Sequence, residues 1–198
     1  MLIIKDSIMK LNIKQLSSFI AFFLLIAVLS GCEKDASGAA FGNNATLIYM
    51  PQATIASLRY TVPAGLDSAT HNYKIDVQNN KVNIILGISG SGSQALNAYT
   101  VNVAANSDTI NQMINNGILP AATTVVLPAA IYTLPATVAV PAGQSMASFY
   151  LSLDKTQLKA YTGKKLALEI VLSNPSMYAL NTTINKTIVI IDVSALNL

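Results

Sequence analysis

Apolar and polar residues alternate through most of the chain from Leu47 to the C-terminus. Alternation with a period of two is typical of strands that bury one face and expose the other. Residues 187–193 are apolar at nearly every position, which predicts a strand covered on both faces. The pattern therefore predicts a mostly β domain of about eight to ten strands. The clearest alternating segments are residues 58–62, 73–77, 82–88, 99–103, 147–153 and 166–172.

One segment, residues 107–117, breaks this alternation. Its apolar residues Ile110, Met113 and Ile114 have helical spacing, between Ser107 as a possible N-cap and Gly117 as a possible C-cap. A parallel βαβ layout would need a helix between most strands. A single short helix among many strands instead predicts a two-sheet β-sandwich.

Prolines punctuate the second half of the chain at Pro128, Pro135 and Pro141. Because proline cannot donate a ladder hydrogen bond, each is expected at a strand start, an edge or a turn. The turn-prone run that begins at Pro141 separates two alternating segments, residues 138–140 and 147–153. The sequence therefore predicts that these two segments form a β-hairpin.

The N-terminal region has the pattern of an export signal. Three lysines precede an uncharged apolar run at residues 16–29, which is shorter than the roughly 20 residues of a transmembrane helix. The next residues, Leu29-Ser-Gly-Cys32, resemble the lipobox of bacterial lipoproteins. That resemblance implies cleavage before Cys32 and acylation of its thiol, which anchors a protein durably when several chains are attached. The alternatives are an ordinary secreted protein with an unmodified cysteine, or a cysteine buried in the core.

The chain has one cysteine, which excludes an internal disulfide. Acidic Glu33 and Asp35, with Lys34 between them, resemble the surface-export signal of Bacteroidota lipoproteins, although a solvated tether explains them equally well. We therefore expect a lipid-anchored protein of the outer membrane that faces the cell exterior. The expected organisation is a signal peptide at 1–31, a flexible tether at 32–44 and a β-sandwich domain at 45–198.

The charge of the chain argues against nucleic acid as a partner. Residues 1–31 contribute +2 of the net charge of +3, so the mature chain is close to neutral. It has one arginine, Arg59, and no basic cluster beyond Lys164 and Lys165.

The order of the elements resembles the Bacteroidota "domain of unknown function 1735" family. That resemblance implies an immunoglobulin-like β-sandwich near the N-terminus of a surface lipoprotein, often encoded beside polysaccharide-uptake systems. Many members of that family continue into a second domain that binds or cleaves glycans, and the family has no agreed catalytic residues. The resemblance is carried by Cys32, the strand at 48–53, the Y-x-V-x-V strand at 99–103, the Asn-rich helix, and the segments 127–134, 138–145 and 166–170.

Residues suited to catalysis are scarce. A zinc site or a Ser-His-Asp triad would have to use His71, the one histidine, which lies in a polar turn. Glycoside hydrolysis needs two carboxylates about 5 to 9.5 Å apart. Asp154 ends a strand, Asp108 starts a helix and Glu169 is expected alone on an outward face. The sequence therefore predicts no enzyme activity, no metal site and no cofactor.

Sugar binding without catalysis remains open. The chain has no tryptophan, so tyrosine would have to supply the aromatic platform on which sugars stack. Tyr150 is expected to point outward from its strand, and Tyr161 lies in a loop. We take these two as candidate ligand-binding residues, with a packed role for Tyr150 as the alternative.

The hypothesis that fits these observations is a non-catalytic surface module that supports glycan binding or uptake, or contact with extracellular proteins. One alternative is a fimbrial or adhesin subunit that donates residues 187–193 to a neighbouring subunit. A small hydrolase is a further alternative. Asp67-Ser-Ala69 and Asp108-Thr-Ile110 also resemble Bacteroidota O-glycosylation sites, although the second fits a helix start equally well.

Overall fold

The computed structural model describes residues 46–67, 69–92 and 96–198. Residues Ala45–Leu198 form one compact unit with its own hydrophobic core, so this body is expected to fold without the preceding residues. The predicted signal peptide at 1–31, the tether at 32–44 and Cys32 lie outside the described residues. No helix in the described ranges is long and apolar enough to cross a bilayer.

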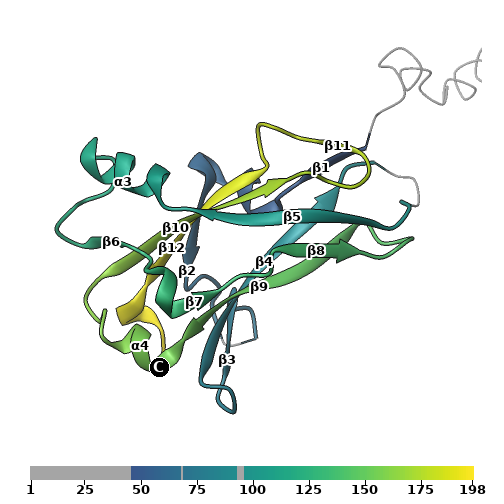
Figure 1. The fold of residues 1–198 in the computed structure, drawn as a ribbon. Coiled ribbons are helices and arrows are strands. Elements are labelled where there is room, and N and C mark those ends of the chain that lie inside the picture. Colours follow the sequence, from purple (N-terminus) through teal and green to yellow (C-terminus); the bar gives the residue numbers. More distant parts are fainter. Residues whose placement is uncertain (1–45, 68, 93–95) are drawn as a thin grey trace, which may run out of the picture. The chain divides into compact units, whose positions relative to one another are not determined.

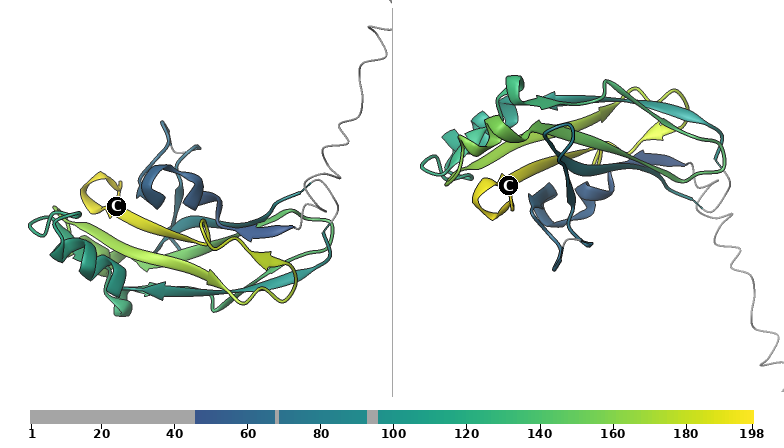
Figure 2. Two further views of the ribbon diagram at one scale, coloured as in Figure 1. Left: turned by 90° about the horizontal axis from the view of Figure 1, so that it is seen from above. Right: turned by 90° about the horizontal axis from the view of Figure 1, so that it is seen from below.

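The body consists of two six-stranded sheets packed face to face (Figures 1 and 2). In sheet A the strand order is β11-β1-β4-β9-β7, and β3 also pairs with β4. This confirms the predicted mostly β, two-sheet sandwich. The strands of sheet A are β1 (Leu47–Tyr49), β3 (Tyr73–Asp76), β4 (Lys81–Gly90), β7 (Tyr132–Thr133), β9 (Met146–Asp154) and β11 (Ala179–Leu180).

In sheet B the strand order is β2-β12-β10-β5-β8, and β6 also pairs with β10. These strands are β2 (Arg59–Val62), β5 (Tyr99–Asn106), β6 (Thr124–Val126), β8 (Thr137–Val140), β10 (Lys165–Ser173) and β12 (Lys186–Asp192). The helices are the predicted α3 (Asp108–Asn115) and a second, unpredicted one, α4 (Lys155–Lys159). Short 3-10 turns are η1 (Pro51–Thr54), η2 (Ala56–Leu58), η3 (Ala129–Ile131) and η4 (Val193–Ala195).

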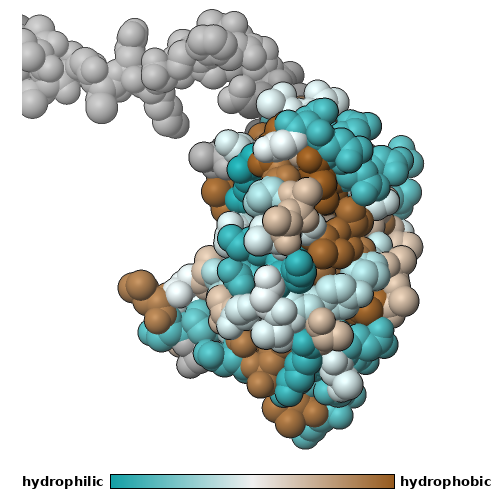
Figure 3. Space-filling model, turned by 90° about the vertical axis from the view of Figure 1, so that its left-hand side faces the viewer, coloured by the Kyte–Doolittle hydropathy of each residue, from teal (hydrophilic) through white to brown (hydrophobic). Residues whose placement is uncertain are grey.

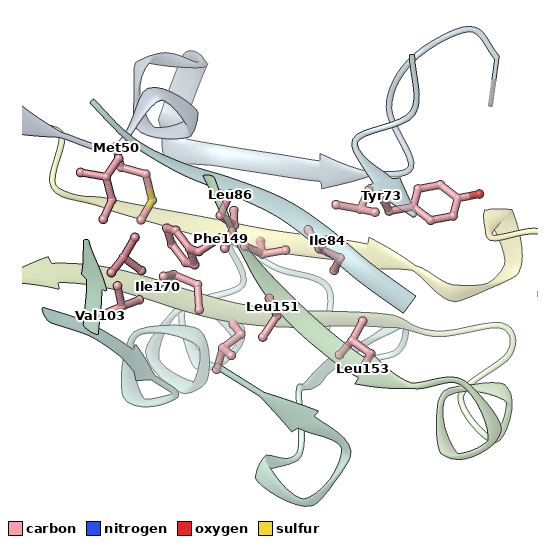
Figure 4. Close-up of a cluster of buried hydrophobic side chains, with 14 of the residues drawn as sticks. Met50, Tyr73, Ile84, Leu86, Val103, Phe149, Leu151, Leu153 and Ile170 are labelled. Atoms are coloured by element: carbon pink, nitrogen blue, oxygen red, sulfur yellow. The ribbon is translucent and has the colours of Figure 1, made fainter. Parts of the chain in front are cut away.

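The main core lies between the sheets, because alternate residues of each long strand point inward. Ile84, Leu151 and Leu153 of sheet A and Ile170 of sheet B are fully buried there (Figure 4). Burying each such side chain contributes about 1.5 to 3 kcal/mol relative to leaving it exposed. The observed period-two burial is therefore the main reason why these segments form strands.

Strand β12 lies inside its own sheet, as the apolar residues at 187–193 predict. It pairs with β10 in the antiparallel direction and with β2 in the parallel direction. The hydroxyl of Thr187, which is fully buried, donates to the carbonyl oxygen of Leu58 at 2.9 Å. A strand paired on both sides within its own chain is not free to be donated to another subunit.

The predicted hairpin between residues 138–140 and 147–153 is wrong. Strand β8 pairs with β5 in sheet B, whereas β9 pairs with β4 in sheet A. The turn that begins at Pro141 therefore carries the chain from one sheet to the other. Alternation predicts which face of a strand is buried, but it does not identify the neighbouring strand.

Helix α3 covers part of the outer face of sheet B, the face turned away from the main core (Figure 2). Ile110 and Leu119 pack there against Ala167 and Ile188 in a second, smaller apolar cluster. Figure 3 views the side that Figure 1 draws at the left, where α3 lies, and shows brown apolar patches separated by polar residues. That side therefore presents a mixed apolar and polar surface.

Glu169 lies on this outer face, as expected, but it is buried rather than exposed, with 2% of its surface accessible. Its Oε2 accepts hydrogen bonds from the Thr109 hydroxyl at 2.7 Å and the Asn106 amide at 3.0 Å. The ammonium of Lys186 lies 3.4 Å from Oε1. The expected exposure was wrong because a pattern within one strand cannot show that a helix lies over it. Glu169 fastens α3 to the sheet.

Replacing Glu169 tests this fastening. We expect Glu169→Ala to lower the free energy of unfolding by about 1 to 2 kcal/mol, because two partly buried donors, the Thr109 hydroxyl and the Asn106 amide, lose their carboxylate acceptor. Glu169→Gln keeps an acceptor oxygen and should lose less. Urea unfolding followed by circular dichroism measures both, with Gln112→Ala on the exposed side of α3 as control, expected within about 0.5 kcal/mol of wild type. Equal stability of Glu169→Ala and wild type would contradict the fastening role.

Candidate functional site

The candidate site is the outer face of sheet A, where β4 and β9 lie side by side. The strand register places Tyr150 opposite Ile85, and Ser148 opposite Gly87. Ser152 lies opposite Asn83. Residues two apart on a strand share a face, so these side chains all point away from the core. We call Asn83, Ile85, Ser148, Tyr150 and Ser152 the β4–β9 face.

Tyr150 is the most prominent group of the β4–β9 face. Its side chain is 42% exposed, which confirms the predicted outward direction. Tyr150 lies opposite the half-buried Ile85, and the exposed Ser148 lies two residues away on the same face. The face thus combines one aromatic ring with small hydroxyl and amide groups.

Charge is confined to one end of the β4–β9 face. Lys81 and Asp154 lie opposite each other there, with Nζ and Oδ2 4.0 Å apart. On β3, Lys74 lies opposite Asn83. Between these groups and the far end of the ladder, the paired residues of β4 and β9 carry no charge. Such a surface can stack and hydrogen-bond a neutral ligand without attracting an ionic one.

Side chains from other elements hold the edge of β4 where it lies between β1 and β3. The Gln52 Oε1 atom accepts a hydrogen bond from Gly87 N at 3.1 Å, and the Tyr60 hydroxyl donates to Ile85 O at 3.1 Å. Pro51 packs against Gly87, where an added Cβ would lie 3.7 Å from the proline Cγ. The strand beneath the β4–β9 face is therefore fixed on both edges.

Sequence reasoning missed the roles of Gln52 and Tyr60. Residues 48–53 were expected to form one strand as part of the family resemblance, but β1 ends at Tyr49 and Gln52 lies in the 3-10 turn η1. Nothing in the sequence pattern indicates that Gln52 substitutes for a missing strand partner. Burial raises the pKa of Tyr60 above its usual value of 10. This shift is consistent with a hydroxyl that acts as a structural donor.

Tyr161, the second candidate ligand-binding residue, lies in the turn that follows α4. Its side chain is half-buried and packs against the main core. Tyr161 N donates to Leu158 O at 3.0 Å, and Lys164 N donates to Tyr161 O at 2.9 Å. The structure thus gives Tyr161 a packing role, whereas Tyr150 is exposed. A ligand-binding role stays a prediction for both.

The titratable groups considered for catalysis have structural partners. The His71 ring stacks on Tyr73, with centroids 5.2 Å apart. Asp67 accepts hydrogen bonds from the Thr70 hydroxyl and backbone N–H, which hold the pKa of the carboxyl below its usual value. Asp154 accepts from Gln157 N and caps α4. Within the described ranges, no group of three His, Cys, Asp or Glu residues is placed to hold a metal ion.

The two O-glycosylation matches differ in what the structure says of them. The Thr109 hydroxyl is engaged with Glu169, which favours the alternative that Asp108-Thr-Ile110 is a helix start. Ser68 of the other match lies outside the described residues.

Comparison with known families identifies the domain. The profile of a family described as a "-like, N-terminal domain" matches residues 42–179 and so spans most of the β-sandwich. The chain belongs to this family. No curated protein matches the chain.

Solved structures from Bacteroides ovatus resemble this N-terminal domain. One of unknown function is 14% identical with a TM-score of 0.50, covering 74% of this chain and 51% of that chain. Another, described as a "putative carbohydrate binding protein", is 10% identical with a TM-score of 0.49, covering 73% and 36%. A third, described as a multidomain protein including DUF1735, is 20% identical with a TM-score of 0.43, covering 67% and 44%. At these identities the likeness concerns the fold alone.

The chain spans between 36% and 51% of the lengths of the solved structures it matches. The family is described as an N-terminal domain, and the matched structures are longer than the part that this chain covers. Both observations indicate that the fold is one part of longer relatives. What those longer relatives bind does not transfer to this chain by fold alone.

A partly buried tyrosine, Tyr60, and a buried one, Tyr99, test how the hydroxyls of this domain are used. We expect Tyr60→Phe to lower the free energy of unfolding by about 1 kcal/mol, because Ile85 O loses a donor. Tyr99→Phe should be neutral or stabilising, since the buried Tyr99 hydroxyl has no hydrogen-bond partner among the described residues. Urea unfolding at pH 7 compares the two variants. A larger loss of unfolding free energy in Tyr99→Phe than in Tyr60→Phe would contradict this assignment.

The same two residues predict the response to alkali. Burial raises the pKa of both Tyr60 and Tyr99, so the folded state disfavours the phenolate. Their contribution to stability is complete below pH 10, the pKa in the unfolded chain, and is lost as the pH rises through the folded pKa. The decline in the free energy of unfolding above pH 10 should be shallower in Tyr99→Phe than in wild type.

Proposed function

We propose that this chain is a lipid-anchored, non-enzymatic surface module that supports glycan capture, with the β4–β9 face as its contact surface. The observation that carries this proposal is the exposed ring of Tyr150 within an uncharged patch of hydroxyl and amide groups. A pyranose ring has apolar C–H faces and a rim of hydroxyls. It can therefore stack on the tyrosine while it hydrogen-bonds to Ser148, Asn83 or Ser152.

The rigidity of the β4–β9 face supports this role. Ligands of low affinity per contact gain from a surface that loses little conformational entropy on binding. Strand β4 is held by its ladder with β9 on one edge and by Gln52 and Tyr60 on the other. The absence of net charge across the patch favours neutral polysaccharides over acidic ones.

The anchoring part of the proposal depends on Cys32 and the residues before it. The apolar run, the lipobox-like Leu29-Ser-Gly-Cys32 and the charged residues that follow are consistent with a lipidated cysteine at the outer membrane. The resemblance to the domain of unknown function 1735 family supports the same location and a link to polysaccharide uptake.

The alternatives have less support. A fimbrial subunit that donates residues 187–193 would need β12 to be free, and β12 pairs on both sides within its own chain. A hydrolase would need paired carboxylates, and Glu169, Asp154 and Asp67 each have a structural partner. Contact with an extracellular protein remains a second use of the β4–β9 face.

Tyr150 variants test the glycan version. We expect affinity gels with neutral polysaccharides to retard the wild-type body, residues 45–198, and Tyr150→Ala to lose about tenfold or more in affinity, because the stacking platform is gone. Tyr150→Phe keeps the ring and should retain most of the binding. Tyr161→Ala is the control variant, because it truncates a tyrosine that packs against the core instead of an exposed one. If none of the polysaccharides binds, contact with an extracellular protein is the only remaining use of the β4–β9 face.

Cys32→Ser tests the anchor separately. We expect the native chain to fractionate with membranes and to carry acyl chains on its N-terminal residue, as measured by mass spectrometry. The Cys32→Ser chain should lack the acyl groups and leave the outer-membrane fraction. A native N-terminus with a bare thiol would contradict the anchor without bearing on glycan binding.

A further inference from the structure

Strand β9 has one edge that is paired along its length and one that is mostly open. On the first edge it pairs with β4 from Met146 to Asp154. On the second it pairs with β7 only at Ser152 and Leu153. Strand β7 then ends, and residues 134–136 carry the chain to β8 in sheet B. Among the described residues, no strand of sheet A therefore flanks β9 beside residues 146–151.

The hydrogen bonds of β4 show which backbone groups of β9 face the open edge. Gly90 N donates to Ser145 O, on the β9 side, whereas Ile85 N donates to Asn72 O, on the β3 side. Backbone groups of successive residues point to opposite edges of a strand. The even-numbered residues of β4 therefore bond to β9, and through the register they bond to its odd-numbered residues.

The even-numbered residues of β9 consequently direct their N–H and C=O groups toward the open edge. Ser152 is already paired with Thr133 of β7. That leaves Met146, Ser148 and Tyr150, whose backbone groups have no hydrogen-bond partner in the described ranges. All three residues are exposed. Strand β8 of sheet B also lies close to β9, but it forms no ladder with β9 and so leaves these backbone groups unpaired.

This open edge lacks the usual protection against strand addition. Natural sheets guard their edges with charged side chains, prolines or bulges. Residues 146–153 of β9 contain no charged residue and no proline, and their pairing with β4 runs without interruption.

We propose that the open edge of β9 pairs with the same edge of a second copy of this chain, in the antiparallel direction about a two-fold axis at Ser148. In this register Ser148 faces its equivalent, and Met146 of each copy faces Tyr150 of the other. All three open residues then exchange hydrogen bonds. The paired stretch ends before Ser152, the residue that β7 already occupies.

Self-complementarity is the reason to name a second copy as the partner. The two exposed side chains at the ends of the open edge, Met146 at 59% and Tyr150 at 42%, become cross-strand neighbours. A thioether beside an aromatic ring is a favourable contact. No like charges meet, because the edge carries none. Strand β8 also has a free edge, but only Thr137 and Ala139 point toward it, which offers fewer hydrogen bonds.

Sedimentation equilibrium on the body, residues 45–198, tests the proposal. We expect a reversible dimer, and Ser148→Pro should raise the dissociation constant about tenfold or more, because it removes an outward N–H without removing a bond to β4. Ser148→Lys places two ammonium groups opposite each other and should act likewise if the proline variant fails to fold. Gln112→Lys adds the same charge on α3 and should leave the dimer intact. A monomer at every concentration, or a dimer unchanged by both Ser148 variants, would overturn the proposal.

Cross-linking tests the register. The body contains no cysteine, so an introduced thiol is its only one. Directly opposed residues of a hydrogen-bonded pair have Cα atoms about 5.5 Å apart, which suits a disulfide. Ser148→Cys should therefore give a disulfide-linked dimer under mild oxidation, whereas Tyr150→Cys should not. The reverse result would overturn the two-fold axis at Ser148. Neither readout depends on glycan binding.

Discussion

The ladder between β4 and β9 is the constraint on which the rest of the molecule depends. It joins nine residue pairs, from Lys81–Asp154 to Ser89–Met146. Its inward side chains form one wall of the main core, and its outward ones form the β4–β9 face. Because one register fixes both sets, a slip by one residue would bury Tyr150 and expose Leu151. Core packing therefore holds the candidate site in place.

The sequence predicted the faces of the strands better than their neighbours. Alternation at 147–153 correctly placed Phe149 and Leu151 inward and Tyr150 outward. The same pattern suggested a hairpin with 138–140, which was wrong. A short connection containing Pro141 and Gly143 fits a hairpin or a crossing between sheets equally well. The choice depends on which partners complete each sheet, and those partners are distant in sequence.

The supports of the candidate site were hidden from the sequence for the same reason. Gln52 holds Gly87 across 35 residues, and Thr109 holds Glu169 across 60. Each is one polar side chain that either replaces a missing backbone partner or donates a hydrogen bond to a buried carboxylate. No periodicity marks such residues, because the contact requires the fold to exist first. Tyr150 was found because exposure on a strand follows directly from alternation.

The two proposals use different parts of the same strand. Glycan capture uses the side chains of β9, and pairing of copies uses its backbone edge. Directly opposed residues of an antiparallel pair lie on one face, so the proposed two-fold axis would join two β4–β9 faces into one continuous surface with two copies of Tyr150. A polymeric ligand could then engage both, and the second contact would be intramolecular. An anchor at Cys32 would confine copies to a plane and raise their local concentration, which lets a pairing that is weak in solution become populated at the membrane.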